Sequence, residues 1–186
     1  MIIRYSEMLK EDLRGKLIIF PTDTVYGVGC LYDDLVAIER IFWLKERDFS
    51  KPLAVLAGDM NQVATLVHMN DDIIRLGGLH WPGALTLVGS KTKVVPDLAT
   101  SHRQTVGIRI PNHEIALGLL RHFGPIVTTS INRSTEPALV RFRDVLTYEG
   151  QVDYVIDGGD LSGEPSTVYD TLTHSVLRQG SVIISE

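Results

Sequence analysis

Residues 17–29, LIIFPTDTVYGVG, change character in the middle. The first four residues are apolar and indicate a buried strand, whereas the rest combine a proline, small polar side chains, a tyrosine and two glycines. The threonine–aspartate–threonine run at 22–24 offers hydroxyls and a carboxylate, and the glycines let the backbone bend or let a ligand approach it closely. The pattern favours a strand that delivers polar groups to the rim of a sheet, where α/β proteins place their ligands.

The composition is that of an ordinary globular protein. The 186 residues include 44% hydrophobic and 22% charged side chains, and no apolar run approaches the roughly 18 residues that a membrane helix needs. The first fifteen residues lack the apolar core of an export signal, and Cys30 is the only cysteine, which fits a reducing cytosol. We therefore expect a cytoplasmic protein with no membrane contact. The net charge of −5 argues against a surface that binds nucleic acid everywhere, although a local basic cleft is compatible with it.

Hydrophobic patterning alternates between short apolar runs and amphipathic stretches. The apolar runs predict strands at 17–20, 52–57, 84–88, 105–110, 126–129, 152–156, 167–170 and 176–178, with a last one at 182–184. The amphipathic stretches predict helices at 33–44, 60–68, 73–79, 114–123 and 143–148. Because no repeat, linker or domain boundary is visible, we expect one α/β domain with a mixed sheet over residues 1–186.

Three stretches carry residues suited to anion binding, and each has a structural alternative. Lys45, Arg47 and Lys51 either complement a helix dipole or form a phosphate-binding cluster. Arg109 should share one sheet face with its alternate neighbours in the strand, and it needs either an anionic partner or solvent. The polar run at 128–134, TTSINRS, is either a hydrogen-bonded turn or part of a binding site.

Several familiar chemistries are absent from the sequence. There is no GxxxxGK[ST] phosphate loop, and the glycines at 27 and 29 lack the third glycine of the dinucleotide fingerprint. The six histidines show no metal-ligand spacing, so we expect no metal site of the protein's own. Cys30 has no activating neighbour in the sequence, and no GxSxG elbow is present, so a nucleophilic mechanism is not indicated.

Taken in order along nearly the whole chain, the motifs resemble those of the YrdC-type threonylcarbamoyl-AMP synthases. They are PTDTVYGVG at 21–29, KER at 45–47, PL at 52–53, WPGALT at 81–86, VGIRIP at 106–111, SIN at 130–132, STVYD at 166–170 and LRQG at 177–180. The resemblance implies a YrdC-like twisted mixed sheet with flanking helices around a concave, positively charged cavity. It also implies an enzyme that condenses L-threonine, bicarbonate and ATP to threonylcarbamoyl-AMP and pyrophosphate.

The resemblance further implies partners and roles for individual residues. Proteins of a tRNA-modifying transfer complex would use the product, tRNA or double-stranded RNA could be contacted directly, and Mg²⁺ would arrive on the triphosphate. Lys45 and Arg47 would be catalytic, and Lys51, Thr105 and Arg178 would bind the nucleotide. The substrate-binding residues would be Thr24, Arg109, Thr128, Ser130, Asn132 and Ser166.

Three departures from the family pattern bear on the substrate pocket. Ile131 is bulkier than the usual residue between the serine and asparagine of the S-x-N motif, Thr135 stands where a glycine is usual, and Leu56 replaces a histidine of some members. Two other functions stay open at this point. One is a divergent YrdC/YciO-like paralogue, against which the intact KER and SIN motifs argue. The other is an RNA-binding module of the same fold, which the net charge makes less attractive.

Overall fold

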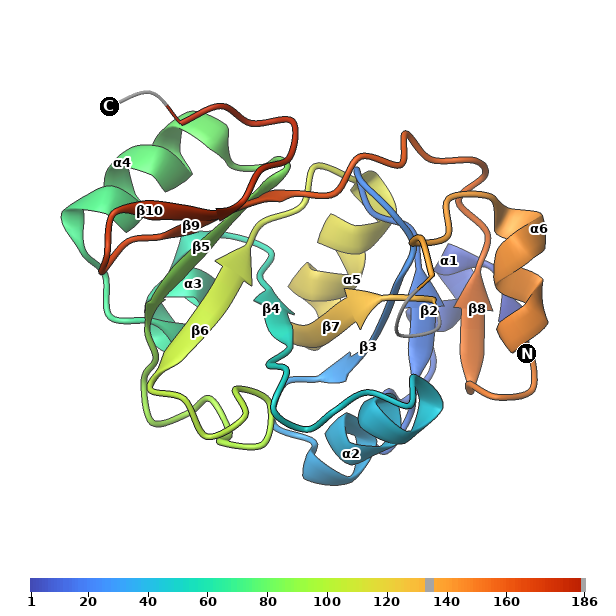
Figure 1. Cartoon of the computed structure of the whole chain (residues 1–186). Helices are drawn as coiled ribbons and strands as arrows, with labels where there is room; N and C mark the ends of the chain where they lie inside the picture. Colours follow the sequence, from blue (N-terminus) through green and yellow to red (C-terminus); the bar gives the residue numbers. More distant parts are fainter. Residues whose placement is uncertain (133–135, 185–186) are drawn as a thin grey trace.

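The computed structural model describes residues 1–132 and 136–184 (Figure 1). Ten strands form one sheet in the order β1-β8-β2-β3-β7-β4-β6-β5-β9-β10. They are β1 (Ile2–Ile3), β2 (Ile18–Phe20), β3 (Gly27–Leu31), β4 (Ala54–Leu56), β5 (Leu85–Ser90), β6 (Thr105–Arg109), β7 (Ile126–Ser130), β8 (Tyr154–Ile156), β9 (Thr167–Asp170) and β10 (Ser175–Arg178). β4 runs parallel to β6 and antiparallel to β7, so the predicted mixed α/β sheet is confirmed.

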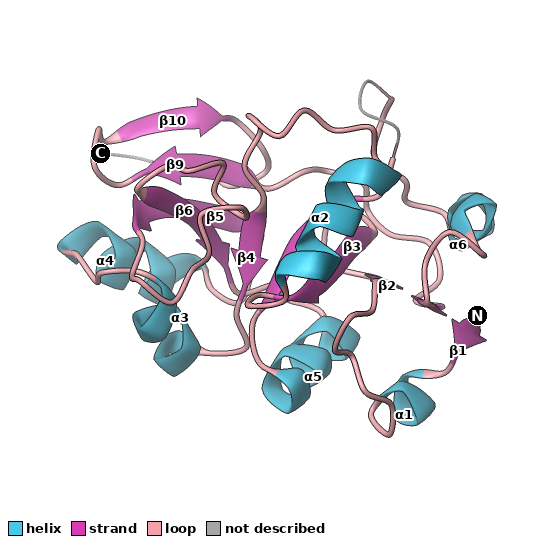
Figure 2. Ribbon diagram, turned by 90° about the horizontal axis from the view of Figure 1, so that it is seen from below, coloured by secondary structure: helices cyan, strands magenta, loops and turns pink. Residues whose placement is uncertain are grey.

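The helices flank this sheet, and Figure 2 shows α1, α3 and α5 together on one side of it. They are α1 (Tyr5–Met8), α2 (Leu35–Leu44), α3 (Met60–Leu66), α4 (Asp71–His80), α5 (Glu114–Phe123) and α6 (Phe142–Val145), the last followed by the 3₁₀ helix η1 (Leu146–Tyr148). Asp34, Asp59 and Asn70 each cap a helix by accepting a backbone N–H from its first turn. Such caps satisfy donors that would otherwise lack partners, and each stabilises its helix by about 1 kcal/mol.

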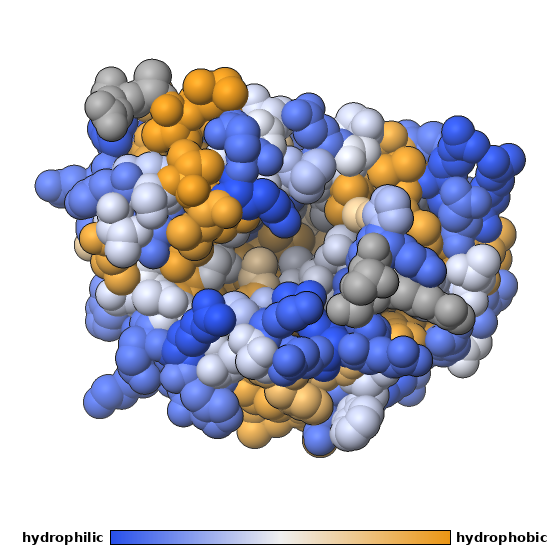
Figure 3. Space-filling view, viewed as in Figure 1, coloured by the Kyte–Doolittle hydropathy of each residue, from blue (hydrophilic) through white to orange (hydrophobic). Residues whose placement is uncertain are grey.

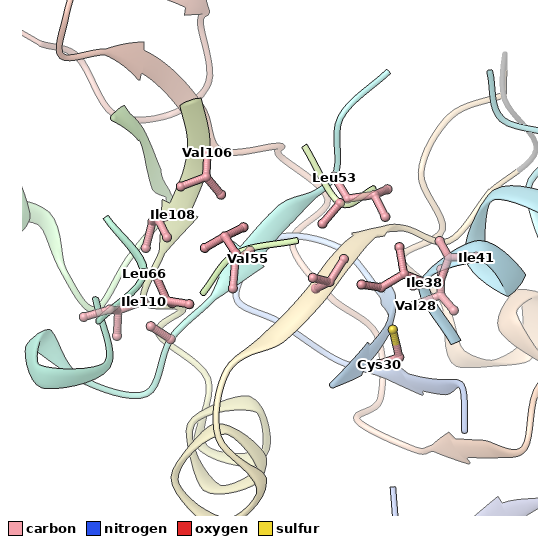
Figure 4. Close-up of a cluster of buried hydrophobic side chains, with 14 of the residues drawn as sticks. Val28, Cys30, Ile38, Ile41, Leu53, Val55, Leu66, Val106, Ile108 and Ile110 are labelled. Atoms are coloured by element: carbon pink, nitrogen blue, oxygen red, sulfur yellow. The ribbon is translucent and has the colours of Figure 1, made fainter. Parts of the chain in front are cut away.

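The core lies between the sheet and its helices, and strand alternation decides which side chains join it. Val106 and Ile108 of β6 are buried in the main cluster, together with residues of α2 and α3 (Figure 4). The alternate residues of β6, Thr105, Gly107 and Arg109, line a cavity instead. Their predicted common face is therefore confirmed, and the sheet carries an apolar side and a ligand-accessible side.

β3 corrects the prediction for the opening stretch of sequence. Gly27 to Leu31 form a strand between β2 and β7, so only residues 21–26 connect strands at the rim. A Cβ atom at Gly27 would lie 2.9 Å from Oγ1 of Thr128, and one at Gly29 would lie 2.6 Å from Cγ2 of Ile126. Both glycines allow close packing against β7 within a strand, so the predicted turn at these residues is wrong. Gly27 also lines the cavity, which agrees with the expected close approach of a ligand to the backbone.

The C-terminal segment corrects a second prediction. Residues 182–184 form no strand, and within the described chain the Val182 carbonyl accepts from two side chains, Thr167 Oγ1 at 2.7 Å and Gln179 Nε2 at 2.9 Å. Across the described residues, no helix combines the length and apolar character that crossing a bilayer requires.

Candidate active site

A cavity of about 540 Å³ opens on the face seen in Figure 3, where hydrophilic residues border the hollow. Its floor is the ligand-accessible side of β3 to β7 and β9, and loops complete its walls. The lining residues include one carboxylate, Asp170, and four cations, namely Arg47, Arg103, Arg109 and Arg178. A protein of net charge −5 thus concentrates positive charge where a ligand would bind, which favours an anionic ligand.

Lys45 joins the KER and SIN motifs, which lie more than eighty residues apart in the chain. Its side chain is buried, and Nζ donates to the Ser130 carbonyl and, at 2.8 Å, to Oδ1 of Asn132. The Ser130 hydroxyl donates to the same Oδ1 at 2.9 Å. Ser130 and Asn132 line the large cavity, whereas Lys45 lines a second hollow of about 340 Å³ beside it. Lys45 therefore lies behind the S-x-N motif and fixes the positions of Ser130 and Asn132.

The backbone geometry at the end of α2 explains the spacing of Lys45 and Arg47. Glu46 adopts a left-handed φ of 49°, its N–H donates to the Trp43 carbonyl, and the Arg47 N–H donates to the Phe42 carbonyl. This pattern is a Schellman motif, which ends a helix by reversing the chain through one left-handed residue. The reversal buries the lysine while the arginine, two positions later, reaches the cavity.

The protonation of Lys45 is perturbed by its surroundings. Burial, and in second place the Arg47 guanidinium, lower the pKa of Lys45 to about 8. Arg47 itself donates through Nε and Nη2 to the carbonyls of Lys51 and Pro52, at 3.1 and 2.9 Å. These carbonyls fix the direction of the guanidinium without neutralising it, so the charge is available to a ligand.

Arg109 is the most firmly held cation of the cavity. Nε donates to the Gly83 carbonyl and Nη1 to Oγ1 of Thr24, both at 3.0 Å, and Nη2 is paired with the Asp23 carboxylate. Burial lowers the pKa of Arg109, and Asp23 opposes that effect by favouring the charged form. The threonine–aspartate–threonine run of the opening sequence therefore supplies the partners of a buried arginine from another strand.

Arg178 of β10, with Ser166 just before β9, forms another polar group at the cavity wall. Arg178 donates to the carbonyl of Ser166 through Nε and Nη2, at 3.0 and 2.8 Å, and to its hydroxyl at 3.0 Å. The Ser166 hydroxyl also lies 2.9 Å from that of Thr86. Arg178 thus orients Ser166 at the cavity wall, and both line the cavity.

The other residues singled out from the sequence differ in their surroundings. Thr105 and Thr128 line the cavity, but the Thr128 hydroxyl donates to the Val28 carbonyl at 3.0 Å. The Lys51 side chain is exposed and lies outside the lining. Arg103 lines the cavity from the segment before β6 and was not predicted from the sequence. The polar run at 101–104 directly before a cavity-lining strand was the available signal.

The departures from the family pattern fall in different places. Ile131 is fully buried in the main core cluster, so its bulk points away from the cavity, whereas Leu56 lines it. Thr135 lies outside the described residues. Tyr26 is a packed core aromatic whose hydroxyl accepts from the Gly158 N–H at 2.9 Å and donates to the Gly159 carbonyl at 2.8 Å.

Metal and thiol chemistry find little support in the described chain. Within residues 1–132 and 136–184, no group of three or more His, Cys, Asp or Glu side chains could hold a metal ion. Asp170 is committed to the β9–β10 turn, where Oδ1 accepts from the backbone N–H groups of Leu172 and Thr173. Burial raises the pKa of Cys30, which keeps the thiol protonated and unreactive.

Comparison of the sequence with those of known proteins identifies relatives of this chain. A threonylcarbamoyl-AMP synthase of Pyrococcus abyssi is 37% identical over 178 residues, which cover 92% of this chain and 52% of that protein. A threonylcarbamoyl-AMP synthase of Vibrio vulnificus is 30% identical over 186 residues, which cover 97% of this chain and 100% of that protein.

Solved structures agree with these relatives in fold. Pyrococcus abyssi Sua5 complexed with L-threonine has a TM-score of 0.92 at 34% identity, covering 97% of this chain and 57% of that one. Escherichia coli YciO has a TM-score of 0.86 at 29% identity, covering 95% of this chain and 89% of that one. The Sua5/YciO/YrdC family model, described as "Telomere recombination", matches residues 12–180. The chain belongs to the Sua5/YciO/YrdC family.

Proposed function

We propose that this chain is an L-threonylcarbamoyladenylate synthase. The observation that carries the proposal is the direct contact of the KER and SIN motifs through Lys45, at the wall of a cavity lined by four arginines. Its relatives named threonylcarbamoyl-AMP synthase, and the threonine complex of Pyrococcus abyssi Sua5, support the same reaction. The divergent-paralogue alternative loses weight because both motifs are intact and in contact.

The reaction needs charge stabilisation more than a nucleophile from the protein. The threonine amine adds to bicarbonate with loss of water and gives a carbamate. A carbamate oxygen then forms a bond to the α-phosphorus of ATP, the bond to the bridging oxygen breaks, and its electron pair leaves on pyrophosphate. Two anions must therefore meet, and fixed cations and donors offset their repulsion while charge develops. Arg47, Arg109 and Arg178 are pre-oriented by hydrogen bonds to the protein, and Arg109 is also buried, which suits this demand.

The residues divide between the two substrates. Arg109 would bind the threonine carboxylate, while Thr24 and Ser166 bind other polar atoms of the amino acid. Arg47 would face the phosphates, with Thr105 and Arg178 near the nucleotide. Lys45 would act through Ser130 and Asn132, which it holds from the neighbouring hollow, and Lys51 would reach the phosphates from outside the lining. Ser130, Asn132 and Thr128 would lie where the two substrates join. Mg²⁺ would enter with ATP as part of the substrate, because among the described residues the lining has one carboxylate, Asp170, which is already hydrogen-bonded.

We propose further that residues 1–186 act as one domain in the cytoplasm and pass the product to proteins of a tRNA-modifying complex. Direct contact with tRNA or double-stranded RNA would use the basic residues around the cavity. Filter binding across a salt series measures such contact, because phosphate-driven binding weakens steeply as salt rises.

Release of pyrophosphate from ATP tests the function. It should require both threonine and bicarbonate, and mass spectrometry should find threonylcarbamoyl-AMP. Arg47→Ala should lower the rate by about 10²–10³-fold, as expected when a group that stabilises developing charge is lost. Lys45→Ala should lower it as well, because Ser130 and Asn132 lose the ammonium group that holds them. The exposed Lys10→Ala variant is the control for charge. Release that is independent of threonine, or full activity in both variants, would contradict the proposal.

A further inference from the structure

Arg103 lies at the side of the cavity that the KER turn borders. It belongs to the segment 91–104, which leaves β5 and returns to β6, and it lines the cavity. Nη2 lies 3.4 Å from the Ser50 carbonyl, which places the guanidinium beside the turn that carries Arg47. Arg103 and Arg47 therefore approach one region of the cavity from two separate loops.

The guanidinium of Arg103 is free to bind, in contrast to the other three arginines of the lining. Within the described residues its side chain makes one hydrogen bond, the long one to the Ser50 carbonyl, so Nε and Nη1 have no acceptor there. Arg47, Arg109 and Arg178 each donate at least two hydrogen bonds of 3.1 Å or less to the protein. A free guanidinium fork matches the oxygens of a phosphate group.

The backbone beneath Arg103 is held firmly even though its side chain is exposed. Lys91 N–H donates to the Gln104 carbonyl at 3.0 Å and closes the segment at its two ends. The Lys91 side chain is 6% exposed, and its ammonium pairs with Asp97 and donates to the Thr100 hydroxyl. That hydroxyl in turn donates to the Arg103 carbonyl at 3.0 Å. The segment thus presents the side chain from a fixed position.

The same segment contains two consecutive residues in left-handed conformation, Ser101 at φ 53° and His102 at φ 61°. For residues with a Cβ atom this conformation costs roughly 1 kcal/mol each, and it persists where the surrounding structure imposes it. The two residues turn the chain directly before Arg103. Backbone strain next to a free cation at a cavity wall indicates that the position of the cation matters.

We propose that Arg103 binds the β- and γ-phosphates of ATP and stabilises the pyrophosphate that leaves. This inference rests on the proposed function, because that reaction breaks the bond between the α-phosphorus and the bridging oxygen and puts the electron pair on pyrophosphate. Arg103 donates to the group on which this charge develops. Arg109 and Arg178, which are committed to the protein, hold the parts of the substrates that stay joined in the product.

Direct binding measurements separate Arg103 from the rest of the site. Calorimetry with ATP, inorganic pyrophosphate and AMP would compare the wild type with Arg103→Ala, Arg103→Lys and the control Arg121→Ala, which removes an exposed arginine outside the cavity lining. Arg103→Ala should weaken ATP and pyrophosphate binding about tenfold or more and leave AMP binding within about twofold. Arg103→Lys should recover part of the loss, because it restores the charge but not the fork.

Each result of these binding measurements either supports or overturns the role of Arg103. Equal losses for AMP and ATP, or unchanged pyrophosphate binding in Arg103→Ala, would overturn the inference. Arg121→Ala should match the wild type, and a loss there as large as that of Arg103→Ala would mean that only overall charge matters. If the wild type released pyrophosphate without threonine, the proposed function would fail, whereas the binding of ATP and pyrophosphate would still test Arg103.

Discussion

The two ends of the cavity hold their arginines in different ways. Arg109 extends from a strand, is buried to 6% exposure, and donates through three nitrogen atoms to partners from two other segments. Arg103 extends from a loop, is exposed, and makes one long contact. The strand-borne end is therefore preformed and satisfied, while the loop-borne end keeps its donors for a ligand. A site that joins two anions can use both arrangements: a rigid binding site for one substrate, and a cation with free donors for the leaving group.

Asp23→Ala should break the preformed end and is the largest effect expected on stability. The Arg109 guanidinium would lose its carboxylate partner while remaining buried, and breaking a buried pair from one side destabilises by several kcal/mol. Because Asp23 retains 15% side-chain exposure, we expect a loss of about 2–4 kcal/mol in urea unfolding.

Arg103→Ala is the matched comparison for Asp23→Ala, and it should change the free energy of unfolding by less than about 0.5 kcal/mol. Asp23→Asn should fall between them, because the amide oxygen still accepts a hydrogen bond but carries no charge. If Asp23→Ala and Arg103→Ala lowered the free energy of unfolding by similar small amounts, the Arg109 end of the cavity would be no more firmly held than the Arg103 end.

Lys45 provides a smaller effect, which depends on pH. Its pKa is about 8 in the folded protein and near 10.4 in an unfolded chain. Between these values the unfolded state binds more protons, so the contribution of Lys45 to stability rises with pH through this window and falls as pH drops through about 8. Relative to Lys45→Met, the wild type should gain about 1–2 kcal/mol between pH 7 and pH 9.5.

Urea unfolding at a series of pH values measures this difference. The exposed lysine Lys10, replaced by Met in the same way, is the control for a general change in charge. If the difference between the wild type and Lys45→Met stayed constant with pH, the ammonium would not be desolvated as the burial of Lys45 indicates.

Local patterning predicted most elements of the fold but not how they pair. The helix over 114–123 and the strand over 167–170 were predicted with the bounds observed, because amphipathic spacing and a terminal glycine or turn mark them. The position of β8 between β1 and β2 depends on contacts between distant segments, which no local pattern contains. β3 was missed because its glycines fit the close approach of β7, which a local pattern does not contain. The strand predicted at 182–184 was wrong: the Val182 carbonyl accepts from the side chains of Thr167 and Gln179.

The site shows a similar division between motif and geometry. The motifs identified the residues that meet around the cavity, including Arg109, Ser166 and Asn132. They did not indicate that Lys45 is buried behind the S-x-N motif, since that depends on how α2 ends. Arg103 belongs to none of the quoted motifs, and the polar run at 101–104 was a weak signal that became meaningful only with the path of the segment 91–104.

Glu46 offers the smallest and most local test, because it is the left-handed residue between Lys45 and Arg47. Glycine adopts this conformation without the Cβ clash, so Glu46→Gly should stabilise the protein by about 0.5–1 kcal/mol, or roughly 1–4 °C in Tm, after the added freedom of the unfolded chain is subtracted. Glu39→Gly, at an exposed position within α2, should instead destabilise by about 1 kcal/mol. Thermal unfolding compares the two, and an equal loss for both would mean that the left-handed turn is not strained. Because Glu46 lies outside the lining of the larger cavity and glycine keeps the left-handed turn, pyrophosphate release should survive its replacement, which would show that the Glu46 side chain is not needed beside the two cations of the KER motif.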